Sequence, residues 1–305
     1  MNSKVVLTGL INIIIMKILK KINIKSAIAL FIPVLLFSCE PPNEEEKFIG
    51  IQLWSVRNDM NADPAATLEQ LGEMGYKFIE AAGYSQGKFY GMEPAEFQAL
   101  VEANDMVFLS SHIGHDLPDE DNWDEAMAWW DKAIEAHVAA GVKYIVQPSM
   151  SKAGYESLDG LKRYCEYFNT IGEKCNEHDI RFGYHNHDDE FEKLEGELIY
   201  DFMLKNTNPE KVMFQLDLYW IDEGGKDPVE YFNNYPGRFE TWHVKDEKEV
   251  GESGKIDFER IFNNAKKSGM EYIIVEVESY NYEPLESVKI SLEYLLDAGY
   301  VKTRK

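Results

Sequence analysis

Histidines and carboxylates recur directly after short apolar runs in this chain. Five of the seven histidines stand at such positions. The last four apolar runs end on or near side chains that could bind a metal ion, namely His185 or Glu190, then Asp217, His243 and Glu276. Imidazole and carboxylate ligands without a thiolate suit a divalent ion such as Mn²⁺, Co²⁺, Mg²⁺ or Zn²⁺. We therefore expect a divalent metal site if these four runs meet in the fold.

Neighbouring side chains could transfer protons at such a site. Candidate bases are Glu276, Glu190 and His187, and candidate acids are His112, Lys245 and again His187. A divalent ion that binds a carbonyl and the adjacent hydroxyl lowers the pKa of the proton on the neighbouring carbon. After that proton leaves, reprotonation on the other face gives epimerisation, transfer to the next carbon gives isomerisation, and loss of a β-substituent gives elimination. The residues alone leave all three outcomes open.

Strand-like runs alternate with segments of helical period from residue 47 onward. The expected strands are 48–54, 76–82, 106–112, 142–147, 180–185, 211–217, 239–244 and 271–278. The expected helices are 64–74, 94–103, 121–140, 157–178, 196–206, 227–234, 257–268 and 284–298. This alternation predicts parallel strands that are joined by crossover helices and buried on both faces.

The predicted fold is an α/β (β/α)8 TIM barrel over residues 47–305, as a single domain. An open doubly wound sheet is the alternative, but no glycine-rich phosphate fingerprint follows the first run. In a TIM barrel the functional side chains lie at the carboxyl ends of the strands. The histidines and carboxylates described above would therefore meet at one rim.

Residues 48–299 resemble the sugar phosphate isomerase/epimerase superfamily with the xylose-isomerase-like TIM barrel, through YHNHDDEF (184–191), QLDLYW (215–220), WHVKD (242–246) and VEVE (275–278). That superfamily also contains inosose dehydratases, ketose 3-epimerases and keto-glycoside lyases. The resemblance implies metal ligands on strands five to eight, as Glu, Asp, His and Glu in the epimerases. The last three correspond to Asp217, His243 and Glu276. His185 stands at the position of the first glutamate, so either His185 or Glu190 from the next loop would complete the set.

The N-terminal segment predicts a bacterial lipoprotein. Lysines precede an apolar stretch over 27–37, which is too short to span a bilayer, and residues 36–39 resemble a lipobox. Residues 1–39 are then a signal peptide, Cys39 is the lipidated residue, and residues 40–46 are an acidic tether. The alternative is an ordinary secretory signal with an incidental cysteine. We expect a protein anchored by lipid in the cell envelope, either periplasmic or surface-exposed.

Charge and aromatic content limit which classes of partner and substrate are expected. Asp and Glu number 54 against 31 Lys and Arg, giving a net charge of -23, which disfavours nucleic acid and highly phosphorylated substrates. Neutral sugars, keto-sugars or glycosides are the expected substrates, and the membrane would be contacted only through the lipid. The oligomeric state stays open. The candidate substrate-binding residues, which include aromatic rings able to stack on a sugar, are Trp54, Arg57, Glu80, His112 and Trp220.

Three hypotheses follow from these patterns. The favoured one is a metal-dependent enzyme that removes a proton next to a sugar carbonyl. The second is a non-catalytic carbohydrate-binding lipoprotein. The third is a phosphodiester-cleaving enzyme, which would need more metal ligands and a surface that does not repel DNA. Cys165 and Cys175 are interpreted as packing residues in a helix, without thiol chemistry.

Overall fold

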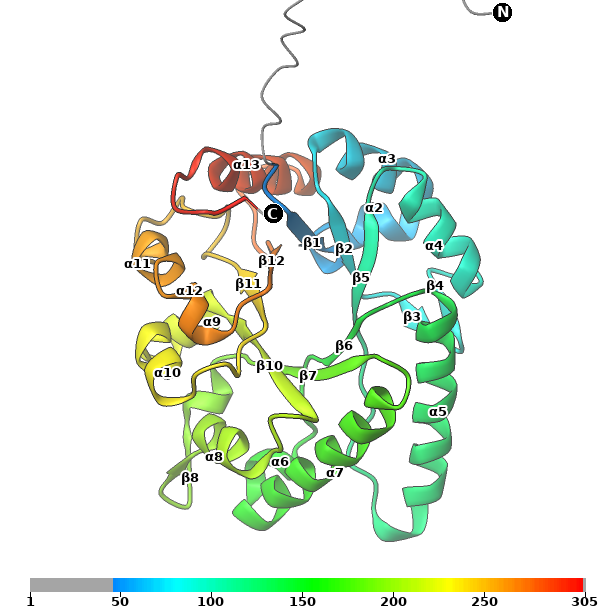
Figure 1. Ribbon diagram of the computed structural model, residues 1–305, viewed down its shortest axis with the longest axis vertical. Helices are drawn as coiled ribbons and strands as arrows, with labels where there is room; N and C mark the ends of the chain where they lie inside the picture. The colour runs from blue at the N-terminus through cyan, green and yellow to red at the C-terminus, as the bar shows by residue number, and fades with distance from the viewer. Residues whose placement is uncertain (1–45, 304–305) are drawn as a thin grey trace, which may run out of the picture. The chain divides into compact units, whose positions relative to one another are not determined.

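The computed structural model describes residues 46–303, which form a closed barrel of parallel strands surrounded by helices (Figure 1). The strand order is β1-β12-β11-β10-β7-β6-β5-β2, so the first and last strands of the chain are neighbours. Closure confirms the TIM barrel and excludes the open sheet. The barrel strands are β1 (Ile49–Gln52), β2 (Phe78–Ala81), β5 (Val107–His112), β6 (Tyr144–Gln147), β7 (Arg181–His185), β10 (Val212–Asp217), β11 (Thr241–Val244) and β12 (Tyr272–Val275).

Helices cover the outer face of the barrel. They are α3 (Pro64–Met74), α4 (Pro94–Glu102), α5 (Trp123–Ala139), α7 (Leu158–Asn176), α8 (Ile199–Asn206), α10 (Pro228–Asn234), α11 (Phe258–Phe262), α12 (Ala265–Ser268) and α13 (Pro284–Asp297). These elements lie within the predicted ranges, except that the helix predicted over 257–268 is interrupted between α11 and α12. Asn263 and Asn264 stand at that break, and asparagine side chains compete with helical hydrogen bonds.

Shorter elements in the loops were not predicted, because a few residues carry too little periodicity to be recognised. They are the helices α2 (Arg57–Ala62), α6 (Ala153–Glu156) and α9 (Leu218–Glu223), the 3-10 turns η1 (Leu53–Val56), η2 (Glu120–Asn122) and η3 (Asp189–Phe191), and the antiparallel pairs β3 (Tyr84–Ser85) with β4 (Lys88–Phe89) and β8 (Lys193–Leu194) with β9 (Glu197–Leu198).

Local signals explain where helix α3 begins and ends. The Asp63 side chain accepts a hydrogen bond from the Ala66 N–H, and Pro64 supplies the fixed φ of the first helical position. The helix ends at Gly75, whose φ of 108° is a left-handed conformation that residues with a Cβ rarely adopt. Asp217 caps α9 in the same manner as Asp63 caps α3, and this fixes a carboxylate at the end of β10.

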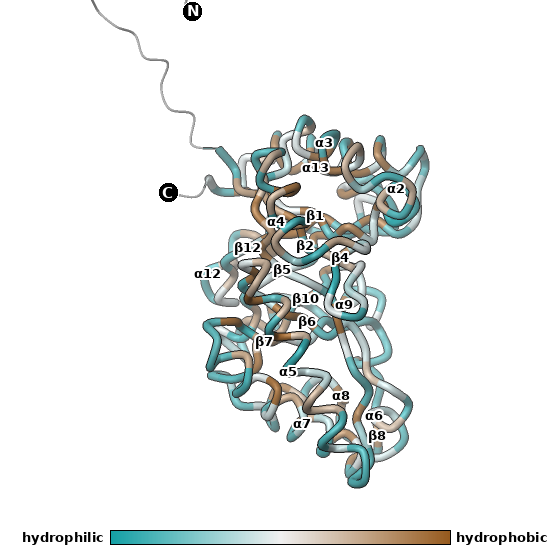
Figure 2. The backbone as a smooth tube through the Cα atoms, turned by 90° about the vertical axis from the view of Figure 1, so that its right-hand side faces the viewer, coloured by the Kyte–Doolittle hydropathy of each residue, from teal (hydrophilic) through white to brown (hydrophobic). Residues whose placement is uncertain are grey.

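Two apolar clusters hold the barrel together. The larger one lies between the strands and the helices, and in Figure 2 hydrophobic stretches follow the inner strands while hydrophilic residues prevail in the outer loops. The smaller cluster consists of Phe78, Leu109, Tyr144, Val146, Met213 and Ile274. The interior of the barrel is therefore a packed core rather than a channel, as is usual for this fold.

Cys165 and Cys175 are buried and unpaired, as interpreted from the sequence. Burial raises the pKa of Cys165 to about 12, which leaves the thiol protonated and unreactive near neutral pH. The described residues contain no helix long and apolar enough to span a membrane. The predicted signal peptide, the lipobox cysteine Cys39 and residues 40–45 of the tether lie outside the described residues.

Candidate functional site

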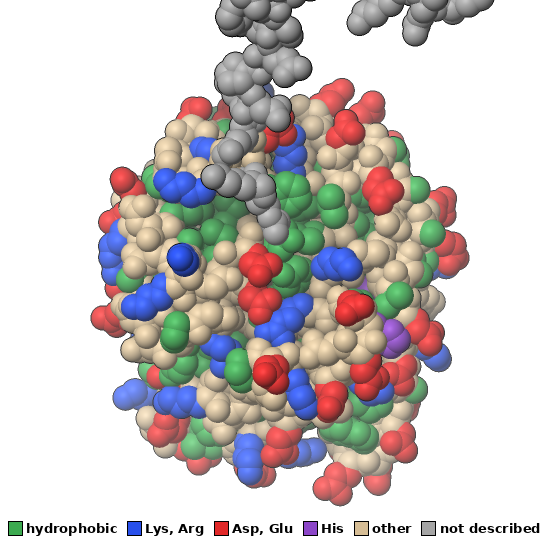
Figure 3. Space-filling model, viewed as in Figure 1, with side chains coloured by type: hydrophobic (Ala, Val, Ile, Leu, Met, Phe, Trp, Pro, Cys, Tyr) green, Lys and Arg blue, Asp and Glu red, His purple; other side chains and the backbone are tan. Residues whose placement is uncertain are grey.

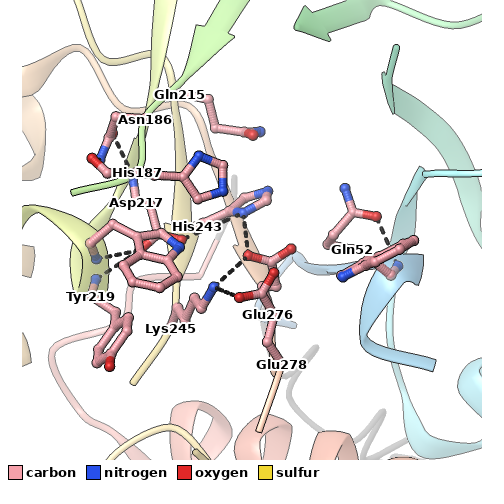
Figure 4. Close-up of polar contacts among 12 residues, drawn as sticks. Gln52, Asn186, His187, Gln215, Asp217, Tyr219, His243, Lys245, Glu276 and Glu278 are labelled. Atoms are coloured by element: carbon pink, nitrogen blue, oxygen red, sulfur yellow. Dashed lines mark hydrogen bonds and ion pairs between the residues drawn. The ribbon is translucent and has the colours of Figure 1, made fainter. Parts of the chain in front are cut away.

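The barrel interior changes from apolar to polar within two residues along a strand. On β10, Met213 belongs to the smaller apolar cluster, and Gln215 and Asp217 follow on the same face because side chains alternate along a strand. Ile274 on β12 is followed in the same way by Glu276. This alternation carries buried polar groups to the carboxyl end of the barrel, where Figure 4 shows them gathered.

Four of the predicted ligands come together at this end. One ligand atom from each of His185, Asp217, His243 and Glu276 lies within 4.8 Å of the other three. His243 Nδ1 is 3.1 Å from Glu276 Oε2 and 3.9 Å from Asp217 Oδ2. Figure 4 shows the side chains of Asp217, His243 and Glu276 turned toward one another. All four residues are buried. A second group shares two of them and adds His112.

The cap on α9 fixes the orientation of the Asp217 carboxylate. Its Oδ1 accepts hydrogen bonds from the N–H groups of Tyr219 and Trp220, at 2.9 and 2.8 Å. Its Oδ2 is buried and has no hydrogen-bond partner among the described residues. Burial raises the pKa of Asp217, Lys245 opposes this, and Glu276 adds to it, with a net value of about 6. A bare, buried carboxylate oxygen of this kind is a typical cation ligand.

His185 presents a second unpartnered atom. Its Nδ1 is buried without a hydrogen bond in the described part of the chain. Burial lowers the pKa of His185 far below its usual range, and the imidazoles of His243 and His187 lower it further. The ring is therefore neutral and offers a lone pair, as a metal ligand must.

The surroundings of His243 also suit a metal ligand. Its Nε2 is 2.6 Å from Glu80 Oε1, and since a carboxylate only accepts, Nε2 donates. Nδ1 then faces Glu276 Oε2, and two acceptors 3.1 Å apart need a proton or a cation between them. Burial lowers the pKa of His243, but Glu276 and Glu80 outweigh this effect and raise it to about 10. The donor atoms thus fit a divalent cation.

Glu80 is predicted from the sequence to contact substrate, but in the structure it lies in a buried network of hydrogen bonds. The side chain is fully buried, and both carboxylate oxygens are already hydrogen-bonded. Burial raises the pKa of Glu80, but His112 and His243 outweigh this and hold it well below its usual range. Its hydrogen-bond partners are Gln52 at 2.8 Å, Ser110 at 2.5 Å, Gln215 at 2.9 Å and His243 at 2.6 Å.

Glu190 is also placed differently from its prediction as ligand or base. Its Oε1 accepts hydrogen bonds from the hydroxyls of Tyr184 and Tyr155, and its Oε2 accepts one from the His187 N–H at 2.7 Å. It does not belong to either group of possible ligands found in the described residues. Of the two candidates for the strand-five ligand, His185 lies within a group of possible ligands, whereas the carboxylate of Glu190 is taken up by other hydrogen bonds.

A pocket of about 430 Å³ opens beside the candidate metal site, and His185 and Glu276 take part in its lining. It is lined by Trp54, Ala82, His112, Pro148, Ser149, His185, His187, Glu276 and Glu278. Trp54 is 46% exposed, so one of its faces can meet a ligand. Arg57, predicted to bind substrate, lies 5.0 Å from the Trp54 ring centre and donates to the Tyr280 hydroxyl at 2.8 Å. It supports Trp54 rather than lining the pocket.

Lys245 stands beside the pocket, between two carboxylates. Its Nζ donates to Glu278 Oε2 at 2.5 Å and to Glu276 Oε2 at 3.3 Å. Burial lowers the pKa of Lys245, but Glu276 and the other nearby carboxylates raise it above the usual range, so the amine stays charged. Nζ also lies 4.6 Å from the Trp220 ring centre. The ring of His187 also lies near Trp220, at 5.5 Å between ring centres, and has no hydrogen bond within the described residues.

Sequence reasoning missed three polar residues of the site. Gln215 and Ser110 both contact the buried Glu80 carboxylate, and the Asn186 side-chain oxygen accepts the Asp217 N–H at 3.0 Å. A signal was present for two of them. Gln215 precedes Asp217 by two residues and Ser110 precedes His112 by two, which places each pair on one face of a strand. Asn186 follows the end of β7, where the strand pattern no longer applies.

Fold and site together define a TIM barrel that carries a candidate divalent-cation site at the carboxyl end of its strands. Residues 68–298 match the family described as xylose isomerase-like TIM barrel, and the chain belongs to that family.

Three proteins similar to this chain are named here. A sugar phosphate isomerase/epimerase from Parabacteroides distasonis ATCC 8503 is 32% identical, with a TM-score of 0.80 over 84% of this chain and 100% of that one. An inosose dehydratase from Lacticaseibacillus casei is 23% identical over 69% of this chain and 80% of its own. The IolI protein with a bound zinc atom has a TM-score of 0.62 over 83% of this chain and 97% of its own, and at 14% identity it shows the fold alone.

Proposed function

We propose that this protein is a divalent-metal-dependent enzyme that removes a proton next to the carbonyl of a sugar or keto-sugar, as an isomerase or epimerase. One observation carries the proposal. His185, Asp217, His243 and Glu276 present ligand atoms within 4.8 Å of one another, and His185 and Glu276 also line a pocket. Two of the four, His185 and Asp217, have buried polar atoms without partners among the described residues. Such a cluster is costly in a merely structural role, because buried polar atoms normally find hydrogen bonds.

The four residues would hold the cation through two imidazoles and two carboxylates. When bound, a divalent ion supplies Lewis-acid polarisation of a carbonyl and its neighbouring hydroxyl, which acidifies the adjacent C–H. The mixed nitrogen and oxygen set is compatible with Mn²⁺, Co²⁺, Mg²⁺ or Zn²⁺. The relative solved with zinc shares the fold and supports a metal ion of this class.

Acid and base roles fall to the side chains that border the pocket. Glu276 and His187 line it and are the candidate bases that remain once Glu190 is excluded by its hydrogen bonds. Lys245 is the candidate acid, because its charged amine lies between Glu276 and Glu278. A charged donor there would stabilise negative charge that develops on a substrate oxygen.

Elimination is the second candidate reaction. The resemblance implies that epimerases of the superfamily use the glutamates of strands five and eight as their acid–base pair. Here His185 stands in place of the first glutamate, and Glu190 is held by hydrogen bonds from two tyrosine hydroxyls and a backbone N–H. Elimination needs one base and an acid for the leaving group, which His187 and Lys245 could provide. The inosose dehydratase among the relatives carries out an elimination according to its name. A keto-glycoside lyase would use the same first proton abstraction.

The proposed substrate carries no phosphate. The pocket is lined by two carboxylates and three histidines, and Lys245 beside it is already paired with both carboxylates. Figure 3 shows the opposite face, at the amino ends of the strands and away from the pocket, where acidic and basic side chains are likewise interspersed. The proposed location in the cell envelope, lipid-anchored at Cys39, agrees with neutral sugars or glycosides as substrates.

The function can be tested by metal analysis and isotope incorporation. The purified protein is analysed for bound metal and incubated in deuterated water with common ketoses and with 3-keto-glucosides. We expect about one divalent ion per chain and deuterium at the carbon next to the carbonyl, with any β-leaving group detected as a released product. Asp217→Ala should lose both the metal and the deuterium incorporation.

A matched control is Asp246→Asn. Asp246 is buried at the end of the neighbouring strand, but its oxygens accept the N–H groups of Glu247 and Gly251 and it is not among the possible ligands. It should retain the metal. Tight sugar binding by a metal-free wild-type protein, with no deuterium incorporated, would instead support the non-catalytic carbohydrate-binding lipoprotein.

A further inference from the structure

The geometry points to a positioning role for Glu80 and Gln215, which together hold His112 in the tautomer with hydrogen on Nε2, so that Nδ1 is a further proton acceptor of the pocket beside Glu276 and His187. The orientation of His112 stands on geometry alone. Its catalytic use deepens the proposed function and rests on it.

The first step is the orientation of the Gln215 amide. Glu80 is a buried carboxylate and can only accept hydrogen bonds. Gln215 lies with Nε2 2.9 Å from Glu80 Oε2, so its NH₂ group faces the carboxylate. Its carbonyl Oε1 must then face the other way, and the amide cannot turn over without setting two acceptors against each other.

The second step fixes the tautomer of His112. Its Nε2 lies 2.6 Å from Gln215 Oε1 and 3.1 Å from Glu80 Oε1, and both of these atoms are acceptors. Nε2 must therefore carry hydrogen. In a neutral imidazole the other nitrogen, Nδ1, is then left with a lone pair.

The third step concerns access to that lone pair. His112 lines the pocket together with Glu276 and His187, and its side chain is 9% exposed. No hydrogen bond of His112 Nδ1 is found within residues 46–303. Nδ1 is therefore the one ring nitrogen of His112 that a bound substrate could engage.

The same carboxylate orients a second imidazole. Glu80 Oε1 accepts from His243 Nε2, which turns His243 Nδ1 toward Asp217 and Glu276. Carboxylates in this position fix the tautomer and ring orientation of metal-binding histidines. A buried charge is expensive unless its hydrogen bonds are satisfied, and here one charge organises both His243 and His112.

The proposed proton transfer is balanced as follows. The C–H bond next to the substrate carbonyl breaks, its proton goes to His112 Nδ1, and its electron pair stays on the substrate as an enolate. The resulting imidazolium, with hydrogen on both nitrogens, is stabilised because Nε2 still donates to Gln215 and Glu80. It then returns the proton to carbon or gives it to a leaving group.

Long-range ¹H–¹⁵N spectra of histidine-labelled protein test the orientation without any activity assay. They are recorded on the chelator-treated and on the zinc-loaded protein above about pH 8, where an unperturbed imidazole is neutral. The His112 signals are identified by their loss in His112→Gln. We expect hydrogen on Nε2 and an unprotonated Nδ1 in both samples. Hydrogen on Nδ1 of His112 would overturn the assignment.

Two variants separate the network from general packing. Glu80→Gln keeps the size of the side chain but adds a donor, so the Gln215 amide can turn and the Nδ1–H tautomer of His112 should gain population. Gln52→Leu removes another hydrogen bond to Glu80 without touching His112 and should leave the tautomer unchanged. Equal spectra for Glu80→Gln and wild type would contradict the network, and the wild-type spectrum decides the orientation even if a variant fails to fold.

Kinetics of His112→Gln test the catalytic step. The glutamine amide can still donate to Gln215 Oε1, but the pocket nitrogen is gone. With a ketose or 3-keto-glucoside that the wild type converts, kcat for deuterium incorporation should fall by about 10²–10⁴-fold, with KM and metal content unchanged. Undiminished kcat in an active system refutes the catalytic role of His112. Absence of turnover in the wild type refutes the proposed function and that role together, whereas the spectra still decide the orientation.

Discussion

Replacing Asp217 with asparagine should make the stability of the barrel independent of divalent cations. Asparagine retains an oxygen that can accept the N–H groups of Tyr219 and Trp220, so the cap on α9 survives. What it removes is the charge on Oδ2, the buried oxygen that has no partner among the described residues. The metal-free variant should therefore be more stable than the metal-free wild type, and it should no longer respond to added metal.

The magnitude follows from the environment of that oxygen. A buried polar atom without a partner costs about 1–3 kcal/mol, and the variant should regain a value in this range. A cation supplied at about 100 times its dissociation constant stabilises the native wild type by about 2.7 kcal/mol. At about 2–4 °C per kcal/mol for a domain of this size, the wild type should gain about 5–10 °C in Tm.

Scanning calorimetry on four samples measures both effects: wild type and Asp217→Asn, each after chelation and after reloading with Mn²⁺ or Zn²⁺. Asp246→Asn serves as the control, because it loses a buried carboxylate whose oxygens are both hydrogen-bonded to backbone N–H groups. It should be somewhat destabilised and still respond to metal. An Asp217→Asn protein that keeps the full metal-dependent gain in Tm would refute Asp217 as a ligand.

Further predictions concern the rest of the chain. Burial lowers the pKa of His137 to about 4, so the unfolded chain binds a proton that the folded one does not. Stability should therefore fall by about 3 kcal/mol as pH drops from about 6.5 to about 4, and His137→Phe should flatten this dependence in urea titrations. In Gly172→Ala the new Cβ would lie 2.1 Å from the Lys211 carbonyl oxygen, and a loss of about 1–3 kcal/mol in urea unfolding is expected; an unchanged midpoint would contradict this packing. Lys245→Met should retain the metal but lose about 10²–10⁴-fold in kcat, and unchanged deuterium incorporation would exclude Lys245 as the acid.

The fold could be predicted from the sequence because its signals are local. Alternating apolar runs and helical periods marked the eight units of the barrel, and the structure shows local caps such as Asp63 and Gly75 at helix ends. The break between α11 and α12 and the short loop helices were not predicted. They depend on a few residues each, and tertiary packing decides their conformation.

The site was predictable only in part. His185, Asp217, His243 and Glu276 could be proposed because strand ends converge in any closed parallel barrel. Glu80 also lies near the end of a strand, yet it is buried with both carboxylate oxygens hydrogen-bonded. Nothing in its local sequence distinguishes it from an exposed strand-end glutamate.

The order of residues along the chain thus determined which side chains face the barrel interior, because the two-residue period of a strand is a local property. The three-dimensional arrangement decided which of them pair. Hydrogen bonds between strands that are far apart in sequence, such as those of Glu80 with Gln215 and His243, are set by barrel closure and by the short range of the hydrogen bond. Barrel closure also brings the hydroxyls of Tyr155 and Tyr184 into hydrogen-bonding distance of Glu190. It leaves Asp217 Oδ2 without a hydrogen-bond partner among the described residues.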